Sequence, residues 1–365
     1  MVVSLRSPRR ALVATFLVTS FLLLLALHHR DSLMGPANYD PSLFPPSENA
    51  ETTPTSSIAV RPPENEEKET TAKEEKLEEG KKKGGEAQQH DLELVVASVK
   101  AEDTSWLHAH LPSWHKNIYV ADDASAPLTV PQNKGREAMV YLTYIIDRYE
   151  SLPPAVLFVH ASRFAWHNDD PDYDALPTLR SFRLPYLREK GYVNLRCVWV
   201  IGCPAEIRPA QDEASVKVEG GVEKITAKHI YKQAFEELLP GIPVPEVVAV
   251  SCCSQFGVTS ETIRARPKED YIRYREWLLA TPLDDALNGR VFEFAWHIIF
   301  GKEAVHCPSA AECYCNVFGL CDMAPASCKD DSCEGRYVLP PYSTLPKGWP
   351  LVGWEQEQRN FTGPL

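Results

Sequence analysis

Two adjacent aspartates, Asp122 and Asp123, directly follow the apolar segment 118–121. If that segment is a strand of an open α/β sheet, its carboxyl end lies where such sheets bind their ligands. A carboxylate at that end is well placed to contact a nucleotide. The residues that come next, Ala-Ser-Ala-Pro, also suit an ordinary turn. We therefore predict that Asp122 or Asp123 binds a nucleotide, with a simple turn as the alternative.

A second polar group follows the apolar segment 155–160. His160 ends this segment, and His167, Asp169 and Asp170 come shortly after it. Mg²⁺ and Mn²⁺ take carboxylate ligands, and such a cation can hold a diphosphate. We predict that these four side chains hold Mn²⁺ or Mg²⁺. The alternatives are a hydrogen-bonded core histidine and a turn made by Asp-Asp-Pro.

Two basic residues, Lys134 and Arg136, flank Gly135 at the start of a predicted helix, 135–149. The first turn of a helix presents free N–H groups, and basic side chains beside it attract anions. We predict that Lys134 and Arg136 contact the nucleotide, with a solvated helix start as the alternative.

Two carboxylates, Glu293 and Asp170, are the candidates for catalysis. Glu293 lies with Trp296 and His297 in an apolar stretch, a setting that also fits plain packing. A carboxylate within hydrogen-bond reach of an acceptor hydroxyl can serve as its general base. The chain has no P-loop, no G-x-G-x-x-G and no G-x-S-x-G. Their absence argues against nucleotide hydrolysis, dinucleotide redox chemistry and α/β-hydrolase chemistry.

The elements that must position these residues alternate along the chain. Short apolar, β-branched runs predict buried strands, and 3–4-residue apolar spacing predicts helices. This alternation predicts an α/β domain, with a mostly parallel sheet and flanking helices. The predicted strands are 92–99, 118–121, 155–160, 196–201 and 247–251, and the predicted helices are 106–115, 135–149, 261–264 and 267–280, with 292–300 as a helix or a strand.

The ten cysteines, an even number, suggest disulfides formed in an oxidising compartment. Six of them crowd the C-terminal region at irregular spacing, and we favour three disulfides in a small staple there over a zinc site. These six are Cys307, Cys313, Cys315, Cys321, Cys328 and Cys333.

The other four cysteines form two close pairs in the sequence. If 196–203 is extended, Cys197 and Cys203 lie roughly 20 Å apart. A disulfide needs Cα atoms within about 7 Å, so these two should not pair with each other. We expect one cross-sheet bond between this pair and Cys252 or Cys253.

The first third of the chain differs from the rest in composition. Residues 11–27 form an unbroken apolar run, long enough to cross a bilayer, and more arginine precedes the run than directly follows it. We predict a cytoplasmic tail (1–10), a membrane anchor (11–27) and a disordered stem (31–90) rich in Pro, Ser, Thr, Glu and Lys. A cleaved signal peptide is the alternative to the anchor.

The chain beyond the stem is expected to lie outside the cytosol. We divide it into an α/β domain (91–303) and a cysteine-rich tail (304–365). Asn360 begins an Asn-Phe-Thr glycosylation acceptor, usable only after export. We therefore predict a single-pass membrane protein with a lumenal or extracellular domain in the secretory pathway, Golgi included. The formal net charge of −12 gives no basic field for nucleic acid, so no nucleic-acid partner is expected.

Several long segments resemble a family widespread in filamentous fungi and catalogued as domain of unknown function 3431. The resemblance covers roughly residues 92–321 and implies no activity. The segments that carry it are VVASVKAEDTSWL, NKGREAMVYLTYIID, FVHASRFAWHNDDP, GYVNLRCVW, CCSQFGVTSETIRARPKEDY and TPLDDALNGRVFEFAWHIIFG.

A weaker resemblance links IYVADDAS, VLFVHAS and CSQFGVTSETI to GT-A-type, family-2-like glycosyltransferases. It implies a nucleotide at Asp122 or Asp123 and a metal at the end of 155–160. His160 and Ser162 stand where that family carries two aspartates. The expected function is that of a glycosyltransferase-like enzyme, which binds a nucleotide sugar through a divalent metal and acts on a glycan acceptor. The alternatives are a non-catalytic, membrane-tethered glycan- or protein-binding domain, and a structural surface protein with Trp166 and His167 buried.

Overall fold

The computed structural model describes residues 91–215, 217–219, 222–322, 328–329, 332–333 and 344–365. The predicted cytoplasmic tail, membrane anchor and stem all lie outside these residues and stay predictions. No helix in the described part is long and apolar enough to span a bilayer.

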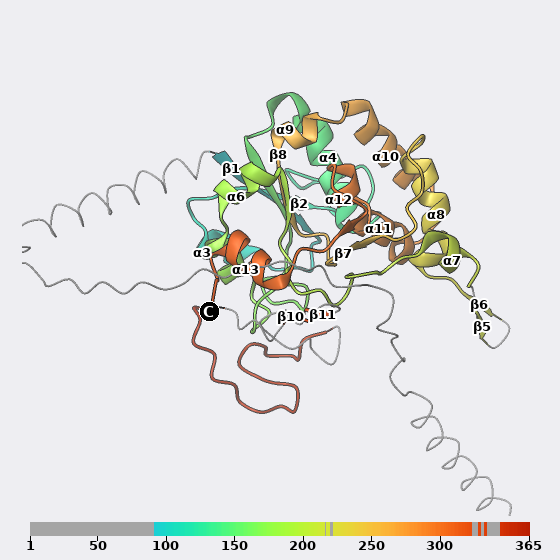
Figure 1. Cartoon of the computed structure of the whole chain (residues 1–365). Helices are drawn as coiled ribbons and strands as arrows, with labels where there is room; N and C mark the ends of the chain where they lie inside the picture. The colour runs from blue at the N-terminus through green and yellow to red at the C-terminus, as the bar shows by residue number, and fades with distance from the viewer. Residues whose placement is uncertain (1–90, 216, 220–221, 323–327, 330–331, 334–343) are drawn as a thin grey trace, which may run out of the picture. The chain divides into compact units, whose positions relative to one another are not determined.

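A five-stranded sheet, in the order β2-β1-β3-β8-β4, lies at the centre of the described residues (Figure 1). β1 (Leu92–Ser98) pairs in parallel with β2 (His115–Val120) and with β3 (Ala155–His160). β8 (Phe256–Thr259) runs antiparallel to its neighbours β3 and β4 (Tyr192–Asn194). Three adjacent parallel strands therefore end at one edge, and the predicted α/β class with a mainly parallel sheet is confirmed.

The sheet is buried on both faces, as β3 illustrates. Side chains alternate along a strand, so Val156 and Phe158 join one core cluster while Leu157 and Val159 join the other. The first cluster is covered by α4 (Glu137–Arg148), α8 (Ala227–Leu238), α10 (Lys268–Ala280), α11 (Asp285–Glu293) and α12 (Trp296–Ile299). The second is covered by α3 (Ser105–His110), α5 (Ala175–Ser181), α6 (Leu184–Lys190) and α13 (Ala310–Phe318).

Shorter elements complete the described part. They are η2 (Tyr149–Ser151), α7 (Pro209–Glu213) and α9 (Ser260–Arg264), with three two-stranded sheets: β5 (Lys217–Glu219) with β6 (Val222–Lys224), β7 (Ala249–Val250) with β9 (Val305–His306), and β10 (Cys328–Lys329) with β11 (Ser332–Cys333).

Two predicted strands differ from the structure. The segment 196–201 is not a strand, because β4 ends at Asn194 and the chain beyond it hydrogen-bonds to the loop after β3. The predicted strand 247–251 is reduced to β7, which lies outside the central sheet. The sheet's antiparallel strand, β8, was not predicted. β8 contains Gly257, where an added Cβ would come 2.9 Å from Leu157 Cδ2, so close packing on β3 requires glycine. Glycine lowers the strand propensity of this segment, which hid the strand in the sequence.

Four disulfides lie in the described residues: Cys197–Cys313, Cys203–Cys307, Cys252–Cys253 and Cys315–Cys321. The prediction that Cys197 and Cys203 do not pair with each other is confirmed. The predicted cross-sheet bond is wrong, because the adjacent Cys252 and Cys253 bond to each other.

The predicted self-contained C-terminal staple is also wrong. Cys307 and Cys313 join the tail back to the segment that follows β4, and among the disulfides of the described residues Cys315–Cys321 alone is local to the tail. The backbones of Cys328 and Cys333 pair in register, but their side chains lie outside the described part. The predicted tail is thus bonded to the α/β domain, and its helix α13 packs in the second core cluster.

We expect non-reducing peptide mapping of the full-length chain to recover Cys252 and Cys253 in one peptide, lighter by two hydrogen atoms than after reduction, since the two residues bond to each other. The same digest should contain crosslinked peptides joining Cys197 to Cys313 and Cys203 to Cys307. A crosslink from Cys252 or Cys253 to Cys197 or Cys203 would contradict this pairing.

Candidate functional site

A cavity of about 620 Å³ opens at the carboxyl ends of β1, β2 and β3. Open α/β sheets bind ligands at this edge. The strands contribute Ala97, Ser98 and His160, Ala121 follows β2 directly, and most of the remaining wall comes from the start of α4, the end of α11 and the loop after β3. A cavity of this size is in the usual range for binding a small molecule or cofactor.

Two largely buried glutamates, with side chains 14% and 11% exposed, line this cavity. Glu137 is the first residue of α4, and Glu293 is the last residue of α11. Burial raises the pKa of each carboxyl group above its usual value, because it disfavours the charged form. Glu293 accepts a hydrogen bond from the backbone N–H of Cys253 at 2.7 Å, and its other oxygen lies 3.3 Å from Arg290 Nε. These contacts fix the Glu293 carboxyl in one orientation.

Two imidazoles lie beside the glutamates. His160 Nε2 is 4.0 Å from a Glu137 carboxylate oxygen and has no hydrogen-bond partner among the described residues. The His160 and His167 rings meet edge to face, with centroids 4.9 Å apart. Burial lowers the pKa of His160 to about 4 and that of His167 to about 2. Both rings are therefore neutral near pH 7 and can accept a proton or a hydrogen bond.

Two arginines, Arg136 and Arg290, bring positive charge to the cavity. The turn before α4 positions Arg136: Gly135 has φ +73°, and an added Cβ there would lie 2.5 Å from Leu278. The backbone N–H of Gly135 also donates to Asp285 at 2.9 Å. The Arg136 side chain packs against α11 at Gly289. A Cβ added to Gly289 would lie 3.2 Å from the Arg136 side chain.

A buried arginine, Arg196, holds the loop that carries Trp166 and His167. Its guanidinium donates to the backbone carbonyls of both residues at 3.1 Å, and to that of Val200 at 3.0 Å. The same guanidinium lies 5.4 Å from the Trp166 ring. Both Trp166 and His167 line the cavity, so the arrangement expected of a purely structural loop, with both rings buried, is not found.

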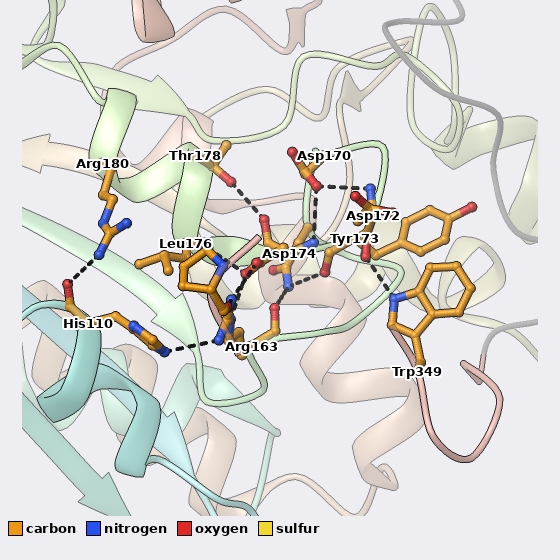
Figure 2. Close-up of polar contacts among 12 residues, drawn as sticks. His110, Arg163, Asp170, Asp172, Tyr173, Asp174, Leu176, Thr178, Arg180 and Trp349 are labelled. Carbon is orange, nitrogen blue, oxygen red and sulfur yellow. Dashed lines mark hydrogen bonds and ion pairs between the residues drawn. The ribbon is translucent and has the colours of Figure 1, made fainter. Parts of the chain in front are cut away.

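The C-terminal segment packs on the same loop (Figure 2). Trp349 Nε1 donates to the Asp172 carbonyl at 2.8 Å, and the Trp349 ring lies 5.4 Å from that of Tyr173. Deeper in the loop, Arg163 forms two hydrogen bonds with Asp174, at 3.0 and 2.9 Å. The loop after β3 is thus fixed from several sides.

Three of the predicted nucleotide-binding residues lie outside the cavity lining. Asp122 accepts a hydrogen bond from the Lys100 N–H at 2.8 Å, and Asp123 caps a turn through Ser125. Lys134 Nζ donates to the carbonyls of Leu279 and Thr281, at 3.1 and 2.5 Å. Of the four predicted nucleotide contacts, only Arg136 faces the cavity.

The predicted metal ligands separate into two sets. His160 and His167 line the cavity, whereas Asp169 and Asp170 do not. One Asp169 oxygen accepts hydrogen bonds from the N–H groups of Cys197 and Val198, and the other accepts one from the Tyr314 hydroxyl. Asp170 accepts from the N–H groups of the turn it begins, and burial raises its pKa to about 6. Both aspartates therefore serve the loop, and Asp170 is not placed for catalysis in the cavity.

The side chains in the cavity do not form a ready site for Mn²⁺ or Mg²⁺. In the described part, one cluster places three ligand atoms within 4.8 Å of one another, and it consists of Cys252, Cys253 and Glu293. Its two sulfurs are bonded to each other and are not thiolates. We therefore assign no catalytic step to a metal, and the cation stays a prediction.

Sequence reasoning missed parts of this site. No role was predicted for Glu137 or for Arg290. Its i,i+3 spacing from Glu293 was the available signal, since such pairs share a helix face. Cys253 lines the cavity beside Glu293, and no sequence pattern indicates that adjacent cysteines bond to each other. Asn360 is exposed, and its glycosylation stays a prediction.

The sheet, its two helical layers and this cavity define an α/β protein with acid–base groups at the carboxyl edge of parallel strands. The chain belongs to the family described as Protein of unknown function (DUF3431), whose model matches residues 94–316, more than half of the chain. The resemblance drawn from the sequence motifs is confirmed to that extent. No curated protein and no solved structure matches the chain.

The pKa of His160 predicts a specific pH dependence. His160 is neutral in the folded protein down to about pH 4 but has a pKa near 6.5 when unfolded, so its contribution to stability is present above pH 6.5 and lost as the pH falls. We expect the wild-type chain to lose about 2 kcal/mol more unfolding free energy between pH 7 and pH 5 than His160→Gln does. Chemical denaturation at both pH values measures this difference.

The exposed His108 supplies the control, since His108→Gln should keep the wild-type pH dependence. Wild type, His160→Gln and His108→Gln all keep the other charged or titratable groups around His160. These groups are Glu102, Glu137, Glu293, His167 and Arg136. Equal losses in wild type and His160→Gln would show that His160 is not held neutral.

Proposed function

We propose that the chain is a glycosyltransferase that moves a sugar from a nucleoside-diphosphate sugar to an acceptor hydroxyl in the cavity. One observation carries this proposal: two arginines and two buried glutamates line the same cavity at the carboxyl ends of β1, β2 and β3. The arginines suit an anionic leaving group, and the glutamates suit proton transfer.

Arg136 and Arg290 are assigned to the diphosphate of the donor. Guanidinium groups bind phosphate oxygens through paired, charge-assisted hydrogen bonds. Arg136 also stands directly before α4, whose first turn adds the partial positive charge of a helix N-terminus. The raised pKa of Glu137 at the same place favours its neutral form, which reduces repulsion of a diphosphate.

Glu293 is assigned as the general base. Its ionised form takes the proton of the acceptor hydroxyl, and the acceptor oxygen then bonds to the anomeric carbon of the donor sugar. The bond from that carbon to the diphosphate breaks, and the nucleoside diphosphate leaves with the electron pair. A raised pKa makes the ionised carboxylate a stronger base, and the hydrogen bond from Cys253 holds it in place.

The proposed location is the lumenal or extracellular side of a secretory-pathway membrane. Four disulfides in the described residues support it, because such bonds persist in oxidising compartments. The anchor at residues 11–27 and glycosylation at Asn360 belong to the same proposal.

A tethered glycan-binding domain without catalysis is the second candidate. The observation that favours it is Trp166, a half-buried indole on the cavity wall, since aromatic faces serve in sugar binding as well as in catalysis. The two candidates differ in whether bound donor is turned over.

Calorimetric titration of the full-length chain with UDP, GDP and their sugars, with and without Mn²⁺, tests the donor site. We expect Arg136→Ala and Arg290→Ala each to weaken nucleotide affinity by about tenfold, the cost of one charge-assisted hydrogen bond. Arg208→Ala, at an exposed arginine outside the cavity, is the matched control and should bind as wild type does. Binding of no nucleotide under either condition would remove the transferase proposal.

Glu293→Gln tests the base separately from binding. Glutamine keeps an oxygen for the Cys253 N–H but cannot take a proton at neutral pH. We expect unchanged nucleotide affinity and at least about a hundredfold slower release of nucleoside diphosphate in the presence of acceptor. Full activity in Glu293→Gln would exclude it as the base, and donor binding by wild type without any release would favour the non-catalytic candidate.

A further inference from the structure

A second hollow, of about 360 Å³, lies between the loop after β3 and the C-terminal segment. The loop contributes residues 164–167, and the C-terminal segment contributes Thr344, Leu345, Pro346, Gly348 and Trp349. The proposed donor and base sites make no use of this hollow.

The hollow adjoins the acid–base cavity. Ala165, Trp166 and His167 line both spaces. A ligand in the hollow would therefore contact residues that also line the cavity beside Glu293. This shared wall is what an extended substrate requires, with one part at the reacting centre and another part outside it.

The lining of the hollow is aromatic and uncharged. It contains the rings of Phe164, Trp166 and Trp349, and no residue of the lining in the described part carries a charge near neutral pH, because burial lowers the pKa of His167 to about 2. The described lining offers no cationic side chain to a phosphate or carboxylate, and the nearby Arg359 guanidinium is stacked on the Trp349 ring. A neutral ligand with an apolar face fits instead, since aromatic faces are negatively polarised and attract C–H groups.

The rings are held in place before any ligand arrives. Trp349 is fixed by its hydrogen bond to Asp172 (Figure 2) and by the Arg359 guanidinium, 3.7 Å from the ring centroid. Phe164 packs edge to face on Phe361, with centroids 5.7 Å apart. Arg196 fixes the backbone of Trp166. Preorganised aromatic walls lower the entropic cost of binding.

We propose that this aromatic hollow is the acceptor subsite, which binds a neutral pyranose ring of a glycan against Trp166 and Trp349. The inference rests on the proposed transferase function, because it places the acceptor's reacting hydroxyl in the adjoining cavity beside Glu293. The ring in the hollow is a neighbouring unit of the same glycan and undergoes no reaction.

An array of neutral oligosaccharides probed with the labelled full-length chain tests the subsite without any nucleotide. We expect binding to at least one class of neutral glycan, and about tenfold weaker binding in Trp349→Ala, which removes one stacking face. Trp277→Ala, at a half-buried indole on α10 outside both spaces, is the matched control and should bind as wild type does.

A second variant fills the hollow and leaves every existing ring in place. Thr344 is exposed at the rim, and Thr344→Trp should block glycan binding while nucleotide affinity and the disulfide map stay unchanged. This variant keeps the test valid if Trp349→Ala disturbs the C-terminal segment.

The outcomes separate the two proposals. Nucleotide binding with no glycan binding, or glycan binding unaffected by both Trp349→Ala and Thr344→Trp, would overturn the subsite and leave the donor site standing. Glycan binding that depends on the hollow, with no nucleotide binding, would support the hollow as a sugar site and remove the transferase.

Discussion

Two buried charged residues, Asp169 and Arg196, join the loop after β3 to the segment that follows β4. Asp169 accepts from the backbone of 197–198, while Arg196 donates to the carbonyls of Trp166 and His167. Losing either side chain leaves buried backbone groups without their hydrogen-bond partner, which typically costs about 1–3 kcal/mol for each such group. The cavity wall depends on these hydrogen bonds. They hold Trp166 and His167 in place, and both residues line the cavity.

Burial also sets the chemistry of the cavity. It raises the pKa of Glu137 and Glu293 and lowers that of His160 and His167, so the charged form of each group is disfavoured. The raised pKa of the two carboxyl groups strengthens each as a general base, while both imidazoles stay neutral near pH 7 and can accept hydrogen bonds.

The C-terminal region is part of the folded unit. Two disulfides connect it to the segment after β4, and α13 packs beneath the sheet. The last described segment, 344–365, then contacts the loop after β3 through Trp349 and Phe361. A tail that looks like an appendage in sequence thereby supplies half of a hollow next to the acid–base cavity.

The sequence by itself determined the α/β class, the strands β1, β2 and β3, and the edge of the sheet where polar residues gather. Those features follow from local patterns, since apolar periodicity reports burial whatever the distant partners are. Only the tertiary structure decided which polar groups face the cavity. Asp169 and Lys134 are occupied by backbone groups away from the cavity, whereas Glu137 and Arg290 line it. Disulfide pairing and the strand around Gly257 were likewise hidden, because they depend on contacts between residues far apart in the chain.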